Sequence, residues 1–365
     1  MAKKKSGTIF DKVLFIGPDV NNRGGIVAVL RAYRDNLPAF HCLSTNSGKG
    51  FIPGIINFVR TVVALPFVRL FTPYTILDVH GSGYKSWRRK RIIIAVGHAL
   101  GFRIIFHIHA GALRKFTEEK GKDYILATTN KCEKVVFLTQ EWARYAREEL
   151  GVKHVETLMN IVSPPAMAKI PRKQGSPLSL VYLGYLLQPK GIFDLLDVMI
   201  ANQDRWRGKV TLTIGGQYNE DKIRAIIKDN GLSDMATFLG WVKGAEKDRI
   251  MATSDVLVLP SYFEGMPICI LEAMTYAIPI ITTPVGGIPE IMTDGIEGTF
   301  ITPGDKKSLG SSHRHVLGTS RTSESTRPSR IQPFTTVPTR KHNRTVGFNH
   351  RQITQLTKKQ PNFSS

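Results

Sequence analysis

The sequence predicts an α/β protein of two domains, each built on a parallel β-sheet with helices between its strands. The chain has 365 residues, which is more than one ordinary hydrophobic core accommodates. Short apolar runs alternate with stretches of helical period from residue 12 to residue 282. A segment rich in proline and glycine divides this alternation into two series. These observations together indicate two sheets of similar construction.

The first domain is expected to span residues 1–160. Its apolar runs are short and bounded by turn residues, as buried parallel strands are. The expected strands are 12–17, 76–79, 103–108 and 134–138, and the expected helices are 26–36, 87–100 and 140–150. Gly24 and Gly25 separate the first strand from the first helix. Glycine there lets a ligand approach the backbone, and a helix start offers N–H donors to phosphate.

The second domain is expected to span residues 180–307, after a linker at residues 161–179 that is too rich in proline to form a regular element. The expected strands are 180–183, 210–214, 236–239, 255–259 and 279–282, and the expected helices are 192–202, 221–230, 245–253 and 267–276. Ligands of open α/β sheets bind at the carboxyl ends of the strands. The two Rossmann-like domains are therefore expected to face each other across a binding cleft.

The last segment, residues 308–365, differs in composition from the rest of the chain. It contains ten Lys/Arg residues and one acidic residue, Glu324, and it has no helical or alternating period. This composition predicts a disordered basic tail. One interpretation is an arm that contacts anionic lipid or nucleic acid. The other, which we favour, is an out-of-frame or otherwise replaced carboxyl terminus.

The composition also bears on the compartment and on partners. The three cysteines, Cys42, Cys132 and Cys269, lie far apart without metal-ligand spacing, which predicts free thiols in a reducing compartment. No apolar signal-peptide run follows the basic amino terminus. We expect a cytoplasmic protein. The net charge of +21 is not accompanied by any nucleic-acid reader motif, so no nucleic-acid partner is predicted.

The segment P-S-Y-F-E-G-M-P-I-C-I-L-E-A, residues 260–273, holds the main functional motif. It begins at the end of an apolar strand and continues as a helix from about Pro267. The helix start would direct unpaired N–H groups at the loop, which suits a phosphate group. Glu272, about two turns into the helix, could hydrogen-bond ribose hydroxyls, while Glu264 on the loop could contact a sugar.

This segment resembles the signature of the retaining family-4 (group 1) glycosyltransferases of GT-B fold. Pro267, Ala273 and Pro279 accompany the two glutamates, and P-V-G-G-I-P-E follows at residues 284–290. The resemblance runs from about residue 13 to about residue 307. It implies transfer of a sugar from a nucleotide-sugar donor to an acceptor hydroxyl with retention of configuration.

The resemblance implies three catalytic residues. His109, in the H-I-H-A-G run that ends the strand at 103–108, would hydrogen-bond the transferred sugar. Lys190 would neutralise the leaving diphosphate, and Glu264 would contact the sugar. The implied donor-binding residues are Gly24, Gly25, Gly184, Gly216, Trp241, Val242, Gly265, Met266, Pro267 and Glu272.

Two further expectations concern metals and alternatives. His107 lies on the same side of its strand as His109, but a zinc site would need ligands that this segment lacks. The chain also has no D-x-D motif, so we expect no metal, and no cofactor besides the nucleotide-sugar co-substrate.

Tyr185 stands where the family usually has an arginine. A catalytically silent GT-B scaffold, truncated or frameshifted, therefore remains an alternative, and a nucleotide-sugar epimerase is a second one.

The acceptor is expected to be a sugar or a lipid-linked sugar, in bacterial surface polysaccharide synthesis. Residues 54–71 are strongly apolar, but Arg60, Pro66 and Arg69 argue against a membrane-spanning helix. We expect this segment to pack as a helix within the first domain. The alternative is that this face and the basic cluster at residues 87–91 lie on an anionic membrane, at the inner face of the cytoplasmic membrane.

Overall fold

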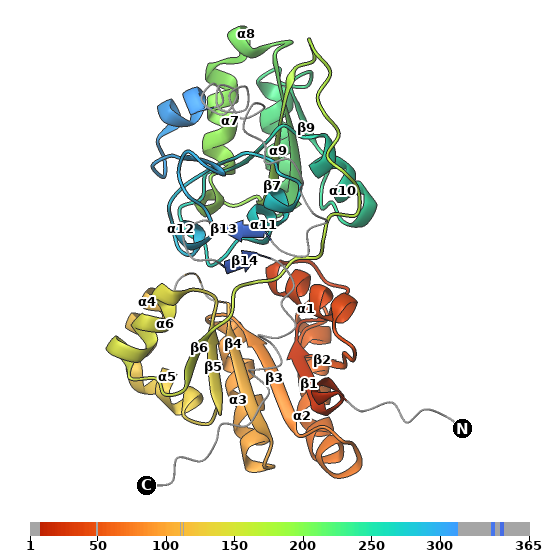
Figure 1. Cartoon of the computed structure of the whole chain (residues 1–365), viewed down its shortest axis with the longest axis vertical. Helices are drawn as coiled ribbons and strands as arrows, with labels where there is room; N and C mark the ends of the chain where they lie inside the picture. Colours follow the sequence, from red (N-terminus) through yellow and green to blue (C-terminus); the bar gives the residue numbers. More distant parts are fainter. Residues whose placement is uncertain are drawn as a thin grey trace, which may run out of the picture. The chain divides into compact units, whose positions relative to one another are not determined.

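The computed structural model describes residues 8–48, 50–109, 111, 113–312, 337–339 and 344–346. The chain divides into two compact units, with the boundary between Ser163 and Pro164 (Figure 1). Each unit is an α/β domain with its own six-stranded parallel sheet. The predicted fold class, two Rossmann-like domains, is confirmed.

Unit 1 has the strand order β2-β1-β3-β4-β5-β6, with every neighbouring pair parallel. The strands are β1 (Val13–Gly17), β2 (Cys42–Ser44), β3 (Ile76–Gly81), β4 (Arg103–Ile108), β5 (Lys134–Phe137) and β6 (Val155–Thr157). The helices are η1 (Ile9–Lys12), α1 (Gly25–Asn36), α2 (Phe51–Phe71), α3 (Lys85–Ala99), α4 (Leu113–Lys120), α5 (Lys122–Thr129), α6 (Gln140–Tyr145) and the π-helical turn η2 (Ala146–Leu150).

Unit 2 has the strand order β12-β11-β10-β7-β8-β9, again all parallel. Its strands are β7 (Leu178–Tyr185), β8 (Val210–Gln217), β9 (Ala236–Phe238), β10 (Val256–Leu259), β11 (Ile280–Thr282) and β12 (Gly298–Phe300). Its helices are η3 (Gln188–Lys190), α7 (Ile192–Ala201), α8 (Gln203–Trp206), α9 (Glu220–Asp229), α10 (Gly244–Thr253), α11 (Ile268–Thr275) and α12 (Ile288–Ile291). The order reverses between β7 and β10, so the topological switch point lies between these two strands.

The region predicted as a disordered tail lies mostly outside the described residues. Residues 306–312 are helical, and β13 (Val337–Thr339) pairs antiparallel with β14 (Arg344–Val346). The prediction of disorder stays a prediction for the remainder.

The two faces of the sheet in unit 1 carry different chemistry. Leu77 and Val79 of β3 belong to the main core cluster, together with Trp87 of α3. The alternate residues Asp78 and His80 are also buried but point to the opposite face. There the ring of Tyr33, from α1, packs against the imidazole of His80 at 5.6 Å. The face covered by α1 therefore contains polar side chains under an aromatic cover.

Helix α2 packs within the first domain, as predicted, but only along one side. It runs unbroken through Pro66 for 21 residues, yet only Thr61 and Leu65 are buried. Of the described helices, it alone is long and apolar enough to cross a membrane by length and composition, with a mean hydropathy of 1.8.

The basic cluster at residues 87–91 also needs correction. Trp87 and Lys90 are buried, at 0% and 1% exposure, because they lie on the face of α3 that packs on the sheet. These two residues cannot contact a membrane. Arg88 and Arg91 are exposed.

Two glycines fix the backbone around the switch point of unit 2. Gly191 has a φ of +69°, and a Cβ atom there would lie 2.1 Å from the carbonyl oxygen of Pro260. Gly286 has a φ of +56°, and its Cβ would lie 1.9 Å from the carbonyl oxygen of Glu264. Only glycine permits both the left-handed backbone and the close approach. The G-G pair in the P-V-G-G-I-P-E run therefore lets one loop pack directly on the Glu264 loop.

Substituting Gly191 with alanine should destabilise unit 2 by more than the left-handed backbone alone explains. Gly208→Ala is the matched control, since Gly208 has a φ of +70° and open space around its Cβ. We expect about 1 kcal/mol of lost stability for Gly208→Ala and at least about 2 kcal/mol more for Gly191→Ala, because its Cβ collides with backbone. Urea unfolding of both variants measures this difference. Equal losses would contradict the close approach at Gly191.

Candidate functional site

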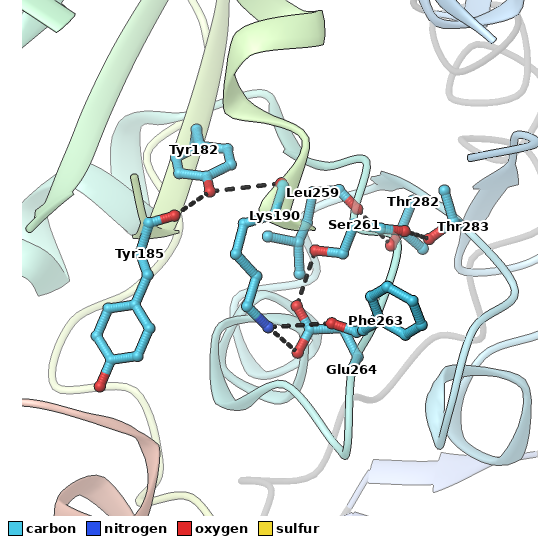
Figure 2. Close-up of polar contacts among 9 residues, drawn as sticks. All are labelled: Tyr182, Tyr185, Lys190, Leu259, Ser261, Phe263, Glu264, Thr282 and Thr283. Atoms are coloured by element: carbon cyan, nitrogen blue, oxygen red, sulfur yellow. Dashed lines mark hydrogen bonds and ion pairs between the residues drawn. The ribbon is translucent and has the colours of Figure 1, made fainter. Parts of the chain in front are cut away.

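The motif residues of unit 2 meet at the switch point. Lys190 follows β7 and Glu264 follows β10, and their side chains form an ion pair of 2.7 Å between Nζ and Oε2. The ammonium also donates to the carbonyl oxygen of Phe263 at 3.1 Å. Figure 2 shows both contacts converging on the lysine nitrogen. Two predicted catalytic residues are thus brought together.

The carboxylate of Glu264 is held from its other side by Ser261. The Ser261 hydroxyl donates to Oε1 at 2.8 Å, and Ser261 is fully buried while Glu264 is 8% exposed (Figure 2). The neighbouring Thr283 hydroxyl donates to the carbonyl oxygen of Ser261 at 2.5 Å. Ser261 was not predicted from the sequence. Its signal was the P-S-x-x-E spacing, which places a serine three residues before the glutamate.

Two helices begin beside this ion pair. The first turn of α7 follows Gly191 directly, and α11 begins at Ile268 after an extended Pro267. The first N–H groups of a helix lack intrahelical partners and carry partial positive charge. A lysine and two such helix starts at a switch point are groups that suit an anion such as a diphosphate.

Glu272 lies in α11, as expected, but it is not unpaired. Oε1 of its carboxylate forms an ion pair with Nζ of Lys247, from α10, a residue that sequence analysis did not identify. The Glu272 side chain is 18% exposed. The second carboxylate oxygen could still accept hydrogen bonds from vicinal hydroxyls.

Tyr185 stands at the sequence position of the family's arginine, but its side chain does not lie beside Lys190 and Glu264. Its backbone carbonyl accepts a hydrogen bond of 2.8 Å from the Tyr182 hydroxyl, while its ring points away from Lys190 and Glu264 (Figure 2). The ring instead lies 5.1 Å from that of Tyr218 and 6.4 Å from that of Trp241, between centroids. This aromatic group at the carboxyl ends of β7, β8 and β9 could accept a planar ring by stacking.

The remaining predicted donor-binding residues of unit 2 lie on the same edge. Gly184 and Gly216 are paired across β7 and β8 near their carboxyl ends. Gly265 accepts a 2.7 Å hydrogen bond from the N–H of Gly287. The side chains of Val242 and Met266 are 7% and 4% exposed, so a contribution to binding would come from their backbone groups.

Unit 1 holds a second polar cluster, at the carboxyl ends of β3 and β4. Nδ1 of His80 and Nε2 of His109 are hydrogen-bonded at 3.0 Å. Oδ1 of Asp78 lies 3.2 Å from Nε2 of His80 and 3.1 Å from Nε2 of His107. His107 and His109 were predicted from the sequence, whereas Asp78 and His80 were not. The D-V-H and H-I-H runs of neighbouring parallel strands carried the signal, because His80 and His107 are in register.

Burial sets the protonation of this cluster. Desolvation lowers the pKa of His80 to about 4, and the neighbouring His107 adds to the effect. The pKa of His109 is also lowered well below its usual range by desolvation, and then by His80 and His107. Burial alone would raise the pKa of Asp78, but the two histidines outweigh it and hold it low. His109 is therefore a neutral imidazole at pH 7, suited to hydrogen bonding with a hydroxyl.

The three histidines are also the described residues best arranged to hold a metal ion. One ring nitrogen from each of His80, His107 and His109 lies within 4.8 Å of the others. The segment at residues 107–111 itself adds no further ligand, as expected, but the neighbouring strand β3 supplies His80. The hydrogen bond between His80 and His109 occupies one nitrogen of each ring and fixes the orientation of His109. Asp78 lies close to His80 and His107 without hydrogen-bond geometry.

Gly24 and Gly25 also lie at the carboxyl edge of the sheet in unit 1, after β1. Gly24 is the residue before α1 and has a φ of +131°, while a Cβ on Gly25 would meet no atom within 4 Å. The first turn of α1 is thus open to a ligand.

Lys90 is a buried cation near the same edge. It extends from α3, and its ammonium donates to the hydroxyl of Thr45, which in turn donates to the carbonyl oxygen of Gly17 at 3.0 Å. Burial lowers the pKa of Lys90 to about 7, and the neighbouring Arg89 contributes. The sequence placed Lys90 in a basic surface cluster and gave no sign of this environment.

The chain is a two-domain α/β protein with a lysine–glutamate ion pair and two helix starts at the switch point of its second sheet. Residues 165–327, which include most of the described part of unit 2, match the family model described as "Glycosyl transferases group 1". Among solved structures, HepE from Anabaena in complex with UDP and glucose is similar with a TM-score of 0.63 and 15% identity, covering 86% of this chain and 95% of that chain. This likeness identifies the fold as GT-B.

Curated relatives match over part of their length. The putative colanic acid biosynthesis glycosyltransferase WcaL of Salmonella typhimurium is 28% identical over 144 residues, covering 37% of this chain and 35% of the relative. The lipopolysaccharide 1,6-galactosyltransferase of the same organism is 26% identical over 160 residues, covering 42% of this chain and 44% of the relative. The chain spans only 33% to 41% of the first three relatives that it matches.

Replacing Lys90 with methionine should stabilise the protein most at low pH. In the unfolded chain the pKa of the lysine is about 10.4. In the folded chain burial lowers the pKa of Lys90 to about 7. Between these values the unfolded state binds more protons, so the stability of the wild type rises with pH. The gain in melting temperature of Lys90→Met should therefore be largest near pH 6 and shrink towards pH 10.

Thermal unfolding at several pH values measures this gain. Lys85→Met, an exposed change on the same helix, serves as control and should show an offset that does not vary with pH. A Lys90→Met variant that is less stable than the wild type by the same amount at every pH would contradict a buried ammonium.

Proposed function

We propose that the chain transfers a glycosyl group from a nucleotide-sugar donor to an acceptor hydroxyl with retention of configuration, as a family-4 enzyme that needs no metal. The observation that carries the proposal is the Lys190–Glu264 ion pair at the switch point of unit 2, beside the first turns of α7 and α11. These groups suit a diphosphate, and they lie within the region that matches glycosyl transferases of group 1.

Lys190 can hold its glutamate and a phosphate at the same time. An ammonium group has three N–H donors. Glu264 and the carbonyl of Phe263 accept two of them, which leaves one for a phosphate oxygen. Ser261 fixes the opposite side of the carboxylate, so the lysine is preorganised before the donor binds. Preorganised charge requires no reorganisation at the moment of reaction.

In the proposed reaction the bond between the anomeric carbon and the diphosphate oxygen breaks. Negative charge collects on the diphosphate, where Lys190 and the helix N–H groups stabilise it. The acceptor oxygen bonds to the anomeric carbon on the face that the diphosphate leaves, so configuration is retained. The proton of the acceptor hydroxyl passes to the departing phosphate oxygen.

Two further residues, one in each unit, have roles in the proposed reaction. Glu272 would accept hydrogen bonds from the ribose hydroxyls, with Lys247 keeping its carboxylate in place. His109, held neutral and oriented by His80, would hydrogen-bond the transferred sugar. The aromatic group around Tyr185 would lie against the base.

The proposed setting is the synthesis of a bacterial surface polysaccharide in the cytoplasm, on a sugar or lipid-linked sugar acceptor. The names of the two relatives above, in colanic acid and lipopolysaccharide synthesis, support this setting. The three cysteines are free thiols, which suits a reducing compartment.

A silent scaffold is the second candidate, because Tyr185 leaves the anion site with one side-chain cation where the family usually has two. Incubation with a labelled nucleotide sugar and a mixture of acceptors separates the candidates. Transfer to an acceptor supports the enzyme, and donor binding without turnover supports the scaffold. A changed sugar nucleotide formed without acceptor would indicate an epimerase.

Replacing Lys190 with methionine should lower kcat/KM about 100- to 1,000-fold, the usual effect of losing one preorganised donor to a developing oxyanion. Lys209→Met is the control, since Lys209 is exposed at the amino end of β8, the opposite edge of the sheet.

Both variants are assayed in buffer containing EDTA, where we expect the wild type to keep its activity. A loss of activity in EDTA, restored by a divalent cation, would refute the metal-independent mechanism.

Replacing Glu272 with alanine should abolish the rise in melting temperature that a nucleotide sugar produces, because the ribose contact is lost. Thermal-shift measurements with UDP-, GDP- and ADP-sugars test this prediction and also identify which nucleotide base the protein binds. Glu246→Ala, an exposed change on α10, should leave the shift intact. An unchanged shift for Glu272→Ala would remove Glu272 from the donor site.

A further inference from the structure

The outer face of α2 is an unbroken apolar surface. Its exposed side chains recur every three or four residues, as positions on one side of a helix do. Six of them, each between 46% and 74% exposed, form what we call the α2 stripe: Ile52, Ile56, Val59, Val63, Phe67 and Leu70. Phe51 and Phe71, at the two ends, are 79% and 78% exposed. An apolar surface of this extent on a soluble domain marks an interaction site.

The opposite side of α2 is fixed to the sheet of unit 1. Leu65 is fully buried in the core, and the Thr61 hydroxyl donates to the carbonyl oxygen of Ser44, in β2, at 2.8 Å. The helix connects β2 with β3 of the same sheet. It cannot cross a bilayer without leaving these contacts. Its geometry is that of a helix lying along a surface, with one face covered by protein and the other available.

The charge around the stripe indicates which partner it fits. Residues 51–71, which form α2, contain two arginines, Arg60 and Arg69, and no acidic residue. Arg60 follows the stripe residue Val59 and is exposed, as are Arg88 and Arg91 on α3, the helix that packs against α2. A second copy of this chain would bring two such cationic surfaces together, which like charges oppose. Anionic lipid headgroups above acyl chains match both the charge and the apolar stripe.

We propose that α2 docks unit 1 on the surface of an anionic lipid bilayer. The α2 stripe inserts among the acyl chains, while Arg60 and neighbouring cations contact the headgroups. The helix lies parallel to the membrane plane and does not span it. This surface goes beyond the proposed glycosyl transfer and does not depend on it, because none of its residues belongs to the donor site.

The test is sedimentation of the full chain with vesicles of phosphatidylcholine alone or mixed with phosphatidylglycerol. Binding to the anionic vesicles should be at least about tenfold tighter and should weaken with salt. Val63→Glu and Phe67→Glu should each lower that binding about tenfold or more, since a charge replaces an inserted apolar side chain. Arg60→Glu should reduce the preference for anionic vesicles.

The matched control is Ile296→Glu in unit 2, because Ile296 and Val63 are both 57% exposed. It should bind vesicles as the wild type does. Thermal unfolding shows that each variant is folded. The thermal shift with a nucleotide sugar should be the same in Val63→Glu as in the wild type, so failure of the docking proposal is distinct from failure of the proposed function.

Four results would overturn the proposal. The first is wild-type binding by Val63→Glu and Phe67→Glu, and the second is equal binding to the two kinds of vesicle. The third is a dimer of the wild type, without vesicles, that Val63→Glu dissociates, which would assign the stripe to a second copy. The fourth is retention of the protein in cell membranes washed with alkaline carbonate, which would mean that α2 spans the bilayer.

Discussion

The ion pair between Lys190 and Glu264 is the interaction on which the donor site depends. It joins the segments that follow β7 and β10, the two central strands of unit 2, and it lies where the strand order reverses. Burial of Glu264 at 8% exposure makes the pair more sensitive to the loss of one partner than a surface pair would be. Ser261 and the loop at Gly286 keep the carboxylate in one orientation, so the lysine is held as a fixed charge.

Much of this arrangement could be predicted from the sequence. Short apolar runs located the central strands of both sheets, and the P-S-x-x-E-G-x-P motif located the switch-point loop. The strands β2, β6 and β12 were missed because their residues are only half-buried and form no continuous apolar run. The partners of the motif residues could not be predicted either. Lys247 and His80 lie far from Glu272 and His109 along the chain, and only the packing of the strands and helices makes them neighbours.

The sequence was least informative for segments that have one side packed against the protein and the other side exposed. The apolar composition of α2 predicted burial, yet composition does not say which side of a helix finds a partner. The basic run at residues 87–91 suggested a charged surface, although Lys90 turns inward to Thr45. In both cases the pattern named the residues correctly and left their orientation open. The two faces of β3 show the same point, because Asp78 and His80 alternate with core residues inside a run that reads as uniformly buried.

The strand order of unit 2 also has a consequence for synthesis of the chain. β7 emerges from the ribosome early, but its central neighbour β10 follows only after β8 and β9. Until then one long edge of β7 has no partner, and an open apolar edge is prone to association with other chains. The half-sheet β7-β8-β9 therefore exposes this edge until β10 has been synthesised. We expect chaperones to bind mainly those nascent chains that end before Leu259.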